Sequence, residues 1–411
     1  MKTCGIIAEY NPFHNGHKRH LEQARLQTGA EKVVVVMSGN FVQRGEPAVC
    51  GKFKRAEMAL RNGADIVIEL PVLFATASAE YFAMAAVKLL DDIGVDFINF
   101  GSENGDIEYL GKAADAVMNE TAEFKQLLKD GLGKGLSFPK ARGEALKAAG
   151  AAIFEPNDIL GVEYLKALKI LGSGIKPTAS KRDKNDAHYH STEIAGDIAS
   201  ATAIRKMLMK YEARGKKAAE TRSKIMQVMP QSAAELLFGE VDAGRWNYAD
   251  RYGDILRYAF AMMSEEQLRE IADMGEGLEN RIISAVKDSG CITDIAMAVK
   301  SKRYTLSRIY RVLFRTILNI RQSELEYYAA TGFSRYARVL GFRKDAVGLL
   351  GKICDSSKIP VVTNVKKAMK GMDNPSLTML EKDLLATRVY NAPLLIGAMI
   401  EPELGTAMVM V

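Results

Sequence analysis

Short apolar segments alternate with helical patterns over the first part of the chain, and this alternation restricts the possible folds more than any other feature. The segments are KVVVVM (32–37), DIVIEL (65–70) and DFINFG (96–101), and helical patterns over about residues 51–62 and 77–92 separate them. Segments this short and this apolar are typical of strands that are buried on both faces. Because alternating strands and helices form right-handed βαβ units, we expect an α/β fold with a doubly wound parallel sheet.

The first strand of this series, residues 3–9, leads directly into a turn and a helix that carry three of the five histidines. Pro12 ends the strand because proline cannot donate a hydrogen bond to a neighbouring strand. His14 and His17 flank the start of the helix, where unpaired N–H groups and the positive end of the helix dipole attract anions. Gly16 between them lets a ligand approach the backbone. We therefore expect a phosphate-binding site at this turn.

The same histidines allow two other interpretations. Any strand-to-helix turn can carry a glycine and a histidine without a function. His14, His17 and His20 could also bind a metal ion, but no cysteine or carboxylate stands nearby at the spacing of zinc ligands. We therefore predict no metal site made by protein side chains.

Two further segments are expected at the same edge of the sheet. The polar loop 38–47 follows a parallel strand, and ligands of doubly wound sheets bind beyond the carboxyl ends of the strands. Residues 198–205, IASATAIR, follow a fifth predicted strand at 175–181. Ser200 has the character of a helix N-cap, and Thr202 falls in the first helical turn. One interpretation of this segment is therefore the start of an ordinary helix without a function. The segment also suits a second phosphate-binding turn.

The composition indicates a globular protein of the cytoplasm. The length of 411 residues suits two or three domains. No apolar run is long enough to span a bilayer, and the N-terminus lacks the apolar core of a signal peptide. Cys4, Cys50, Cys291 and Cys354 show no pairing pattern, which fits a reducing compartment. The net charge of +6 permits a polyanionic partner without requiring one.

From about residue 223 onward the pattern is mostly helical, and the segment 295–323 is strongly basic. We expect one amphipathic helix there, with an apolar stripe and a separate cationic face. Cations without a counter-charge repel one another unless an anion lies among them, so we interpret this face as an RNA contact. A solvated helix face is the alternative. A cluster of Arg335, Arg338, Arg343 and Lys344 extends the surface, and the residues that we expect to contact RNA are Arg308, Arg311 and Arg315.

Several of these segments together resemble a known family. HNGH at 14–17 is similar to the HxGH signature of the nucleotidyltransferase superfamily. The longer string GIIAEYNPFHNGH resembles the bacterial tRNA(Met) cytidine acetate ligase family, as do SGNFVQRGEPA, FGSE, NDILGVEYLKAL, the Lys181-Arg182 pair and IASATAIRK. The match covers the first half of the chain and is weaker beyond residue 230. It implies a Rossmann-like catalytic domain over residues 1–222 and a mostly helical tRNA-binding domain over residues 223–411.

The resemblance also implies the residues of the active site. His14, His17 and Arg205 would be the catalytic residues, and Ser200 and Thr202 would hold the phosphates of the nucleotide together with Arg205. The remaining nucleotide-binding residues carried over from the family are Ile7, Ala8, Glu9, Tyr10, Asn11, Pro12, Phe13, His14, Asn15, Gly16, His17, Lys18, Arg19, His20, Gly101, Asn157 and Arg182.

For the family, the implied reaction has two steps. ATP, with Mg²⁺ bridging its phosphates, adenylates acetate to acetyl adenylate, and the acetyl group then passes to the exocyclic amine of the wobble cytidine in elongator tRNA(Met). Two alternatives stay open from the residues themselves. One is an adenylyltransferase that acts on a phosphorylated small metabolite and does not need the basic helix. The other is a non-catalytic RNA-binding protein on a nucleotidyltransferase fold.

Overall fold

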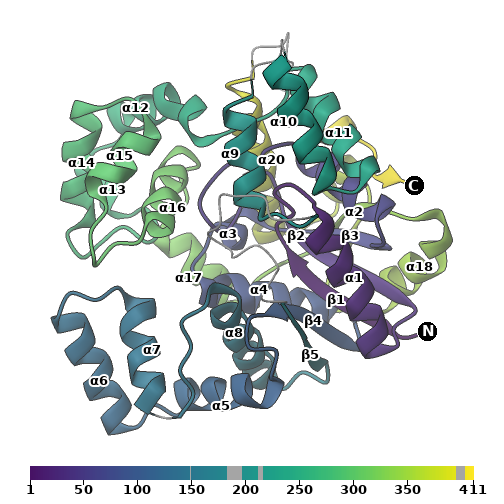
Figure 1. Ribbon diagram of the computed structural model, residues 1–411, viewed down its shortest axis with the longest axis horizontal. Coiled ribbons are helices and arrows are strands. Elements are labelled where there is room, and N and C mark those ends of the chain that lie inside the picture. Colours follow the sequence, from purple (N-terminus) through teal and green to yellow (C-terminus); the bar gives the residue numbers. More distant parts are fainter. Residues whose placement is uncertain (149, 183–196, 212–215, 395–402) are drawn as a thin grey trace.

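A computed structural model gives the fold and describes residues 1–148, 150–182, 197–211, 216–394 and 403–411. Within these residues, one sheet of eight strands lies at the centre, in the order β5-β4-β1-β2-β3-β6-β7, with β8 paired to β6 (Figure 1). The strands are β1 (Thr3–Ala8), β2 (Lys32–Ser38), β3 (Ile66–Leu70), β4 (Phe97–Ser102), β5 (Lys176–Lys181), β6 (Ala337–Phe342), β7 (Val361–Val362) and β8 (Val409–Met410).

The first five strands are parallel, as the alternating pattern predicted. The chain moves from β1 to β2 and β3 on one side, and then returns to place β4 and β5 on the other side. This reversal leaves the carboxyl ends of β1 and β4 open, which is where doubly wound sheets bind their ligands. The prediction of an α/β fold with a doubly wound parallel sheet is therefore confirmed.

Helices connect the parallel strands and extend beyond them. The helices of the first half are α1 (Asn15–Thr28), α2 (Lys52–Arg61), α3 (Val72–Ala75), α4 (Ala79–Asp92), α5 (Ile107–Met118), α6 (Ala122–Gly133), α7 (Phe138–Ala148), α8 (Pro156–Leu171) and α9 (Ala201–Met209). Those that follow are α10 (Lys216–Gln227), α11 (Gln231–Asp242), α12 (Gly253–Met262), α13 (Glu265–Arg269), α14 (Leu278–Asp288), α15 (Ile292–Val299), α16 (Leu306–Ile317), α17 (Gln322–Ala330), α18 (Val347–Ser356), α19 (Val365–Ala368) and α20 (Asn374–Asn391).

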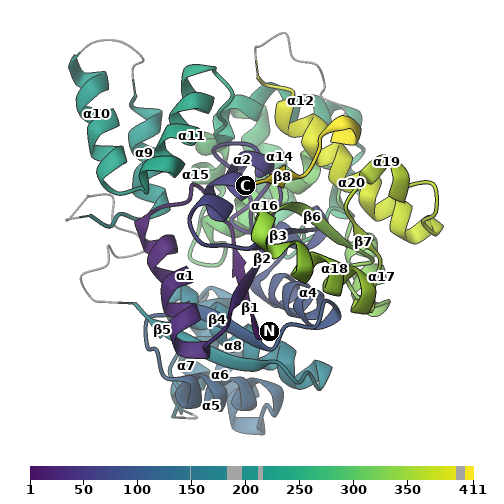
Figure 2. The ribbon, with the colours of Figure 1, turned by 90° about the vertical axis from the view of Figure 1, so that its right-hand side faces the viewer.

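Strands β1 to β4 are mostly apolar, and helices cover both faces of the sheet (Figures 1 and 2). Successive side chains of a strand point to opposite faces. Along β2, Val33, Val35 and Met37 therefore belong to one core, which α1, α2, α9, α10 and α11 complete. Val34 and Val36 belong to the other core, which includes residues of α4, α8, α16 and α20. The two cores therefore lie on opposite faces of the sheet.

The second half of the chain completes the sheet of the first half. β6 pairs antiparallel with β3, through partners such as Ile66 and Phe342, and β7 and β8 then pair with β6. The sheet is therefore mixed, whereas we expected a purely parallel sheet. Local sequence patterns could not reveal this pairing, because β6 lies more than 260 residues from β3 in the sequence. The proposed division after residue 222 does not coincide with an edge of this sheet.

The basic segment 295–323 is not one helix, and this expectation was wrong. α15 ends at Val299, and a non-helical segment precedes α16, whose N-cap is Thr305. The Oγ1 of Thr305 accepts a hydrogen bond from the backbone N–H of Arg308 at 3.4 Å, which starts a new helix. Asn319, with a φ of 48°, then separates α16 from α17.

In the described ranges, no helix combines the length and the apolar character that crossing a bilayer requires. The four cysteines are free thiols, and Cys4 and Cys50 are buried.

Candidate active site

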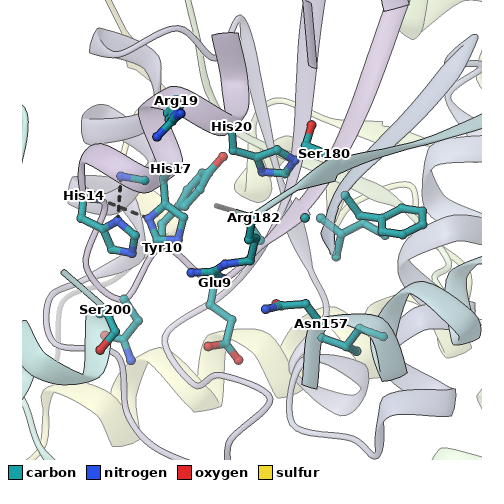
Figure 3. Close-up of a pocket in the computed structure, with 18 of the residues that line it drawn as sticks. Glu9, Tyr10, His14, His17, Arg19, His20, Asn157, Ser180, Arg182 and Ser200 are labelled. Carbon is teal, nitrogen blue, oxygen red and sulfur yellow. Dashed lines mark hydrogen bonds between the residues drawn. The ribbon is translucent and has the colours of Figure 1, made fainter. Parts of the chain in front are cut away.

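Two histidines hold the first turn of α1, at the carboxyl end of β1. His14 is the N-cap residue, and its Nδ1 accepts a hydrogen bond from the backbone N–H of Gly16 at 3.1 Å. His17 lies three residues later, and its Nδ1 accepts a hydrogen bond from the backbone N–H of His14 at 3.3 Å. The rings stack with their centroids 3.7 Å apart (Figure 3). A Cβ on Gly16 would lie 3.0 Å from the His14 ring, so the absence of a side chain at this position leaves room for the ring.

These two hydrogen bonds determine which nitrogen of each imidazole can act on a ligand. Because each Nδ1 accepts a hydrogen bond, each neutral ring carries its proton on Nε2. Burial, assisted by the charge of Arg182, lowers the pKa of His14 to about 3. Burial and the neighbouring positive groups also lower the pKa of His17 well below its ordinary value. Both rings are therefore neutral Nε2–H donors at pH 7, beside the positive end of the α1 dipole.

The third histidine of this segment has a different partner. The Nε2 of His20 lies 2.8 Å from the Oδ1 of Asn99 on β4. The amide nitrogen of Asn99 donates to Gln27 and Thr178, so Oδ1 is the acceptor and the proton of His20 is on Nε2. Among the described residues, no three His, Cys, Asp or Glu side chains are grouped so that they could hold a metal ion. The three histidines form a hydrogen-bonding wall.

A second helix begins at the same site. Ser200 is the N-cap of α9, and its Oγ accepts a hydrogen bond from the backbone N–H of Ala203 at 3.1 Å. Arg205 lies in the second turn, where its Nη1 donates to the carbonyl oxygen of Asn11 at 2.8 Å. Its Nη2 lies 3.3 Å from a carboxylate oxygen of Glu46. α9 thus brings a helix N-terminus and a guanidinium group to the turn that follows β1.

The ends of β4 and β5 supply the opposite wall. Gly101 is in β4, and a Cβ there would lie 4.0 Å from the side chain of Arg182, which follows β5. The positive charge of Arg182 lowers the pKa of all three histidines, which places its guanidinium group close to them. Asn157, at the start of α8, donates from Nδ2 to the Oε1 of Glu103 at 2.5 Å. Figure 3 shows Arg182 and Asn157 facing the histidines across the site.

These walls enclose a cavity of about 210 Å³. The residues that the sequence predicted for the nucleotide and that line it are Ile7, Ala8, Glu9, Tyr10, Asn11, His14, Gly16, His17, Arg19, His20, Gly101, Asn157, Arg182, Ser200, Thr202 and Arg205. The structure therefore brings together segments that lie up to 200 residues apart.

Four residues of the predicted nucleotide site do not line the cavity: Pro12, Phe13, Asn15 and Lys18. Phe13 is fully buried, and its ring packs against Tyr10 with the centroids 4.8 Å apart. The Nδ2 of Asn15 donates to the carbonyl oxygens of Asp197 and Gln227, at 2.8 and 3.0 Å. Phe13 and Asn15 therefore hold the turn in place, and Lys18 is exposed.

The loop after β2 contributes residues that the sequence reasoning did not name. Gln43 and Arg44 line the cavity, and the Nη1 of Arg44 donates to the Oγ1 of Thr202 at 3.2 Å. The backbone N–H of Gln43 donates to the Oε1 of Glu9 at 2.9 Å. The position of this loop at the carboxyl edge was the available signal, but its ten residues gave no indication of which side chains turn inward. Other unpredicted lining residues are Gln23, Phe82, Phe100, Leu160, Tyr164, Ser180, Lys181, Ile198 and Ala201.

The expected cationic face of α16 is not an exposed surface. Arg315 is fully buried and Arg311 is 8% exposed, and both pair with a carboxylate oxygen of Asp273, at 3.3 and 3.1 Å. Arg308 pairs with Glu276 at 2.8 Å. The interpretation that these three cations lack counter-charges was wrong, because the acidic partners come from another segment of the chain. Arg338, from the second predicted cluster, is also buried, at 3% exposure.

Comparisons with known proteins show which family this chain is similar to. The family model described as HIGH Nucleotidyl Transferase matches residues 1–397. A protein of Acetivibrio thermocellus named tRNA(Met) cytidine acetate ligase is 41% identical over 399 residues, covering 95% of this chain and 94% of the relative. A protein of the same name from Caldanaerobacter subterraneus is 42% identical and covers 95% of each chain.

A solved structure of a protein from the same family has the same fold. The crystal structure of Thermotoga maritima TmcAL bound with alpha-thio ATP superposes with a TM-score of 0.89 at 34% identity, over 100% of both chains. The similarity extends through the second half of the chain, where the sequence motifs were weaker. The chain therefore belongs to the HIGH nucleotidyl transferase family and, within it, to the tRNA(Met) cytidine acetate ligases.

Proposed function

We propose that this protein uses ATP to activate acetate as acetyl adenylate, and then transfers the acetyl group to the exocyclic amine of the wobble cytidine of elongator tRNA(Met). The observation that carries the proposal is the convergence of two helix N-termini and two neutral histidine donors on one cavity. The names of the relatives and the nucleotide in the T. maritima structure support the same activity.

In the first step, an oxygen of acetate attacks the α-phosphorus of ATP, and pyrophosphate leaves. Negative charge then increases on the α-phosphate oxygens and on the leaving group. His14 and His17 can donate from Nε2 to these oxygens without moving, and preorganised donors of this kind stabilise a transition state strongly. Arg205 now lies against Glu46, and we propose that it contacts the β- and γ-phosphates when ATP is bound.

Magnesium is expected to accompany the ATP phosphates. Among the described residues, the cavity lining contains one carboxylate, Glu9, and therefore no set of oxygen ligands that could enclose the ion. This donor set fits an Mg²⁺ ion that is held mainly by phosphate oxygens and water, as is usual for this cation. When bound, the ion would neutralise part of the triphosphate charge, beside Arg182 and Arg205.

The second step requires a tRNA surface outside the cavity. Because Arg311 and Arg315 are buried, we propose that exposed cations beside α16 make the phosphate contacts instead. Lys300, Lys302 and Arg303 lie in the turn between α15 and α16, and all three are exposed. We also place the protein in the cytoplasm, where its four free thiols would stay reduced.

One experiment tests the proposed function directly. The protein is incubated with ATP, Mg²⁺, radiolabelled acetate and total tRNA, and the tRNA is digested to nucleosides. We expect the label in a single modified cytidine, and no label when ATP is omitted. Transfer of AMP to a phosphorylated metabolite, with no label in tRNA, would instead support the metabolite adenylyltransferase. Binding of tRNA without turnover would support a non-catalytic protein.

A further inference from the structure

Glu9 carries the only carboxylate in the cavity lining that the structure describes. The same lining contains five cationic side chains, those of Arg19, Arg44, Lys181, Arg182 and Arg205. Both proposed small substrates, ATP and acetate, are anions, and a fixed carboxylate repels them. The negative charge of Glu9 therefore weakens substrate binding, and its presence requires another explanation.

The position of Glu9 is fixed from two sides. The residue directly follows β1, the middle one of the five parallel strands β5, β4, β1, β2 and β3. Its Oε1 accepts a hydrogen bond from the backbone N–H of Gln43, at 2.9 Å, and the side chain of Gln43 donates to the carbonyl oxygen of Ala77 at 3.3 Å. A carboxylate has about four acceptor positions on its two oxygens, so one backbone amide leaves most of them for a ligand. Figure 3 shows the carboxylate of Glu9 extending into the cavity.

An aromatic wall lies beside this carboxylate. Tyr164 on α8 lines the cavity and is 4% exposed, and Phe82 and Phe100 line it as well. Tyr164 and Glu9 line the same cavity, and the charge of Glu9 adds a smaller increase to the rise that burial causes in the pKa of Tyr164. Unpaired bases are commonly bound by stacking on aromatic side chains, so this part of the cavity suits a nucleobase.

We propose that Glu9 is the general base of acetyl transfer, and this inference rests on the proposed function. The N4 amine of the cytidine attacks the carbonyl carbon of acetyl adenylate, and a carbon–nitrogen bond forms. The bond from that carbon to the phosphate oxygen breaks, and AMP leaves with the electron pair. The carboxylate of Glu9 accepts the proton that N4 loses and later releases it to water.

General-base catalysis is needed at this step for a chemical reason. The lone pair of the cytosine N4 is delocalised into the ring, so the amine is a weak nucleophile, and it becomes strongly acidic once the new bond forms. A positioned carboxylate that takes this proton accelerates such a transfer by about 10²–10⁴-fold. The first step has no proton to remove, because acetate attacks as an anion. Glu9 should therefore matter for the second step and little for the first.

Substitution of Glu9 by glutamine separates this role from a structural one. The amide oxygen of Gln can still accept the hydrogen bond from Gln43, so Glu9→Gln keeps the loop contact and removes the basicity. The matched control is Glu80→Gln, which changes an exposed carboxylate on α4 that pairs with Lys166 at the surface. The two half-reactions are measured apart, by acetate-dependent ATP–pyrophosphate exchange and by single-turnover transfer of labelled acetyl groups to tRNA.

We expect Glu9→Gln to slow acetyl transfer by about 10²-fold or more and to slow pyrophosphate exchange by a much smaller factor. Wild-type transfer by Glu9→Gln would overturn the inference. An equal loss in both steps, or a changed Mg²⁺ requirement for exchange, would also overturn it, because Glu9 would then act on ATP. Absence of label in tRNA with the wild-type protein would refute the proposed function itself.

Discussion

At the scale of single residues, His14 and His17 use Nδ1 to hold the start of α1, and in the proposed mechanism they use Nε2 to bind the ligand. Each Nδ1 completes the N-terminal capping of α1, and this contact leaves each Nε2–H for the phosphates. The positive charge of Arg182 and the burial of the rings disfavour protonation. In the proposed mechanism, the neutral imidazoles therefore act as oriented dipoles, and the arginines supply the positive charge.

The first prediction concerns His17→Ala and the pH dependence of adenylation. Loss of this donor should lower acetate-dependent pyrophosphate exchange by about 10²–10³-fold. The wild-type rate should show no inflection near pH 6.5, the ordinary pKa of histidine, because His14 titrates only near pH 3 and His17 also titrates far below its ordinary value. Exchange is measured between pH 5 and 8, with Lys18→Ala as the control from the same helix turn.

The same pKa shifts have a consequence for stability. A histidine whose pKa is lowered by folding stabilises the native state fully above pH 6.5, and this contribution decreases as the pH falls toward the folded pKa. We expect the free energy of unfolding to decrease between pH 6.5 and 4, and to decrease less in His17→Ala.

An adenylation rate in the wild type that follows a single ionisation near pH 6.5 would contradict the interpretation that His14 and His17 are neutral donors.

At the scale of elements, α16 supports the loop that carries Arg44 into the cavity. Gly45 in this loop has a φ of 75° and lies directly against α16. A Cβ on Gly45 would lie 2.1 Å from the backbone nitrogen of Arg311 and 2.5 Å from the backbone carbon of Tyr310. The helix that the sequence marked as an RNA surface therefore positions a wall of the active site.

The second prediction is that Gly45→Ala damages both stability and adenylation. The backbone conformation alone disfavours alanine by about 1 kcal/mol, and the contact with α16 must open in addition. We expect a loss of about 2–4 kcal/mol in the free energy of unfolding and at least a tenfold lower exchange rate. Gly111→Ala in α5 is the control, since a Cβ there meets nothing within 4 Å and should leave both quantities unchanged or improved. A stable, active Gly45→Ala protein would show that the loop does not depend on α16.

The third prediction locates the RNA contacts. Lys300→Glu combined with Lys302→Glu should weaken tRNA binding and reduce the slope of its salt dependence by about one unit for each lost phosphate contact. Pyrophosphate exchange should not change, because neither residue lines the cavity. Reversal of Arg311 and Arg315 should instead destabilise the fold, since it would place buried carboxylates against Asp273. An unchanged salt slope in the Lys300/Lys302 variant would exclude this turn as the RNA surface.

At the scale of the whole molecule, a buried cluster of charges joins the two halves of the chain. Lys52 on α2 and Glu69 on β3 come from the first half, and Arg338 on β6 and Glu403 near the C-terminus come from the second. Arg338 lies 3.2 Å from Glu69 and 2.7 Å from Glu403, and Lys52 pairs with both carboxylates. All four side chains are at most 4% exposed, and their formal charges cancel.

The fourth prediction is that Arg338→Met destabilises the protein by about 3–5 kcal/mol, because removal of one cation leaves two buried carboxylates with a single lysine. Arg343→Ala removes an exposed ion pair with Asp345 and should change the stability by less than about 1 kcal/mol. Urea denaturation at pH 7 measures both values. Similar small changes in the two variants would show that the buried cluster does not join the halves.

Much of the fold and of the site could be predicted from the sequence, because these features depend on residues that are neighbours in the chain. Strands β1 to β4 were recognisable because each is a short apolar segment that a helical pattern follows. The turn with His14, Gly16 and His17 and the cap at Ser200 were recognisable because a helix start depends on neighbouring residues. The convergence of these turns also followed, since the carboxyl ends of parallel strands meet at one edge.

The sequence by itself therefore determined the α/β class and the edge that carries the site, and its resemblance to a known family implied most of the residues that line the cavity. Only the tertiary structure decided which charges are free. Arg311, Arg315 and Arg338 looked like surface cations because their partners, Asp273, Glu69 and Glu403, lie tens to hundreds of residues away. The antiparallel addition of β6 and the support of Gly45 by α16 are equally non-local. Whether a charged side chain faces water, RNA or a buried partner depends on the packing of distant segments, which no local pattern encodes.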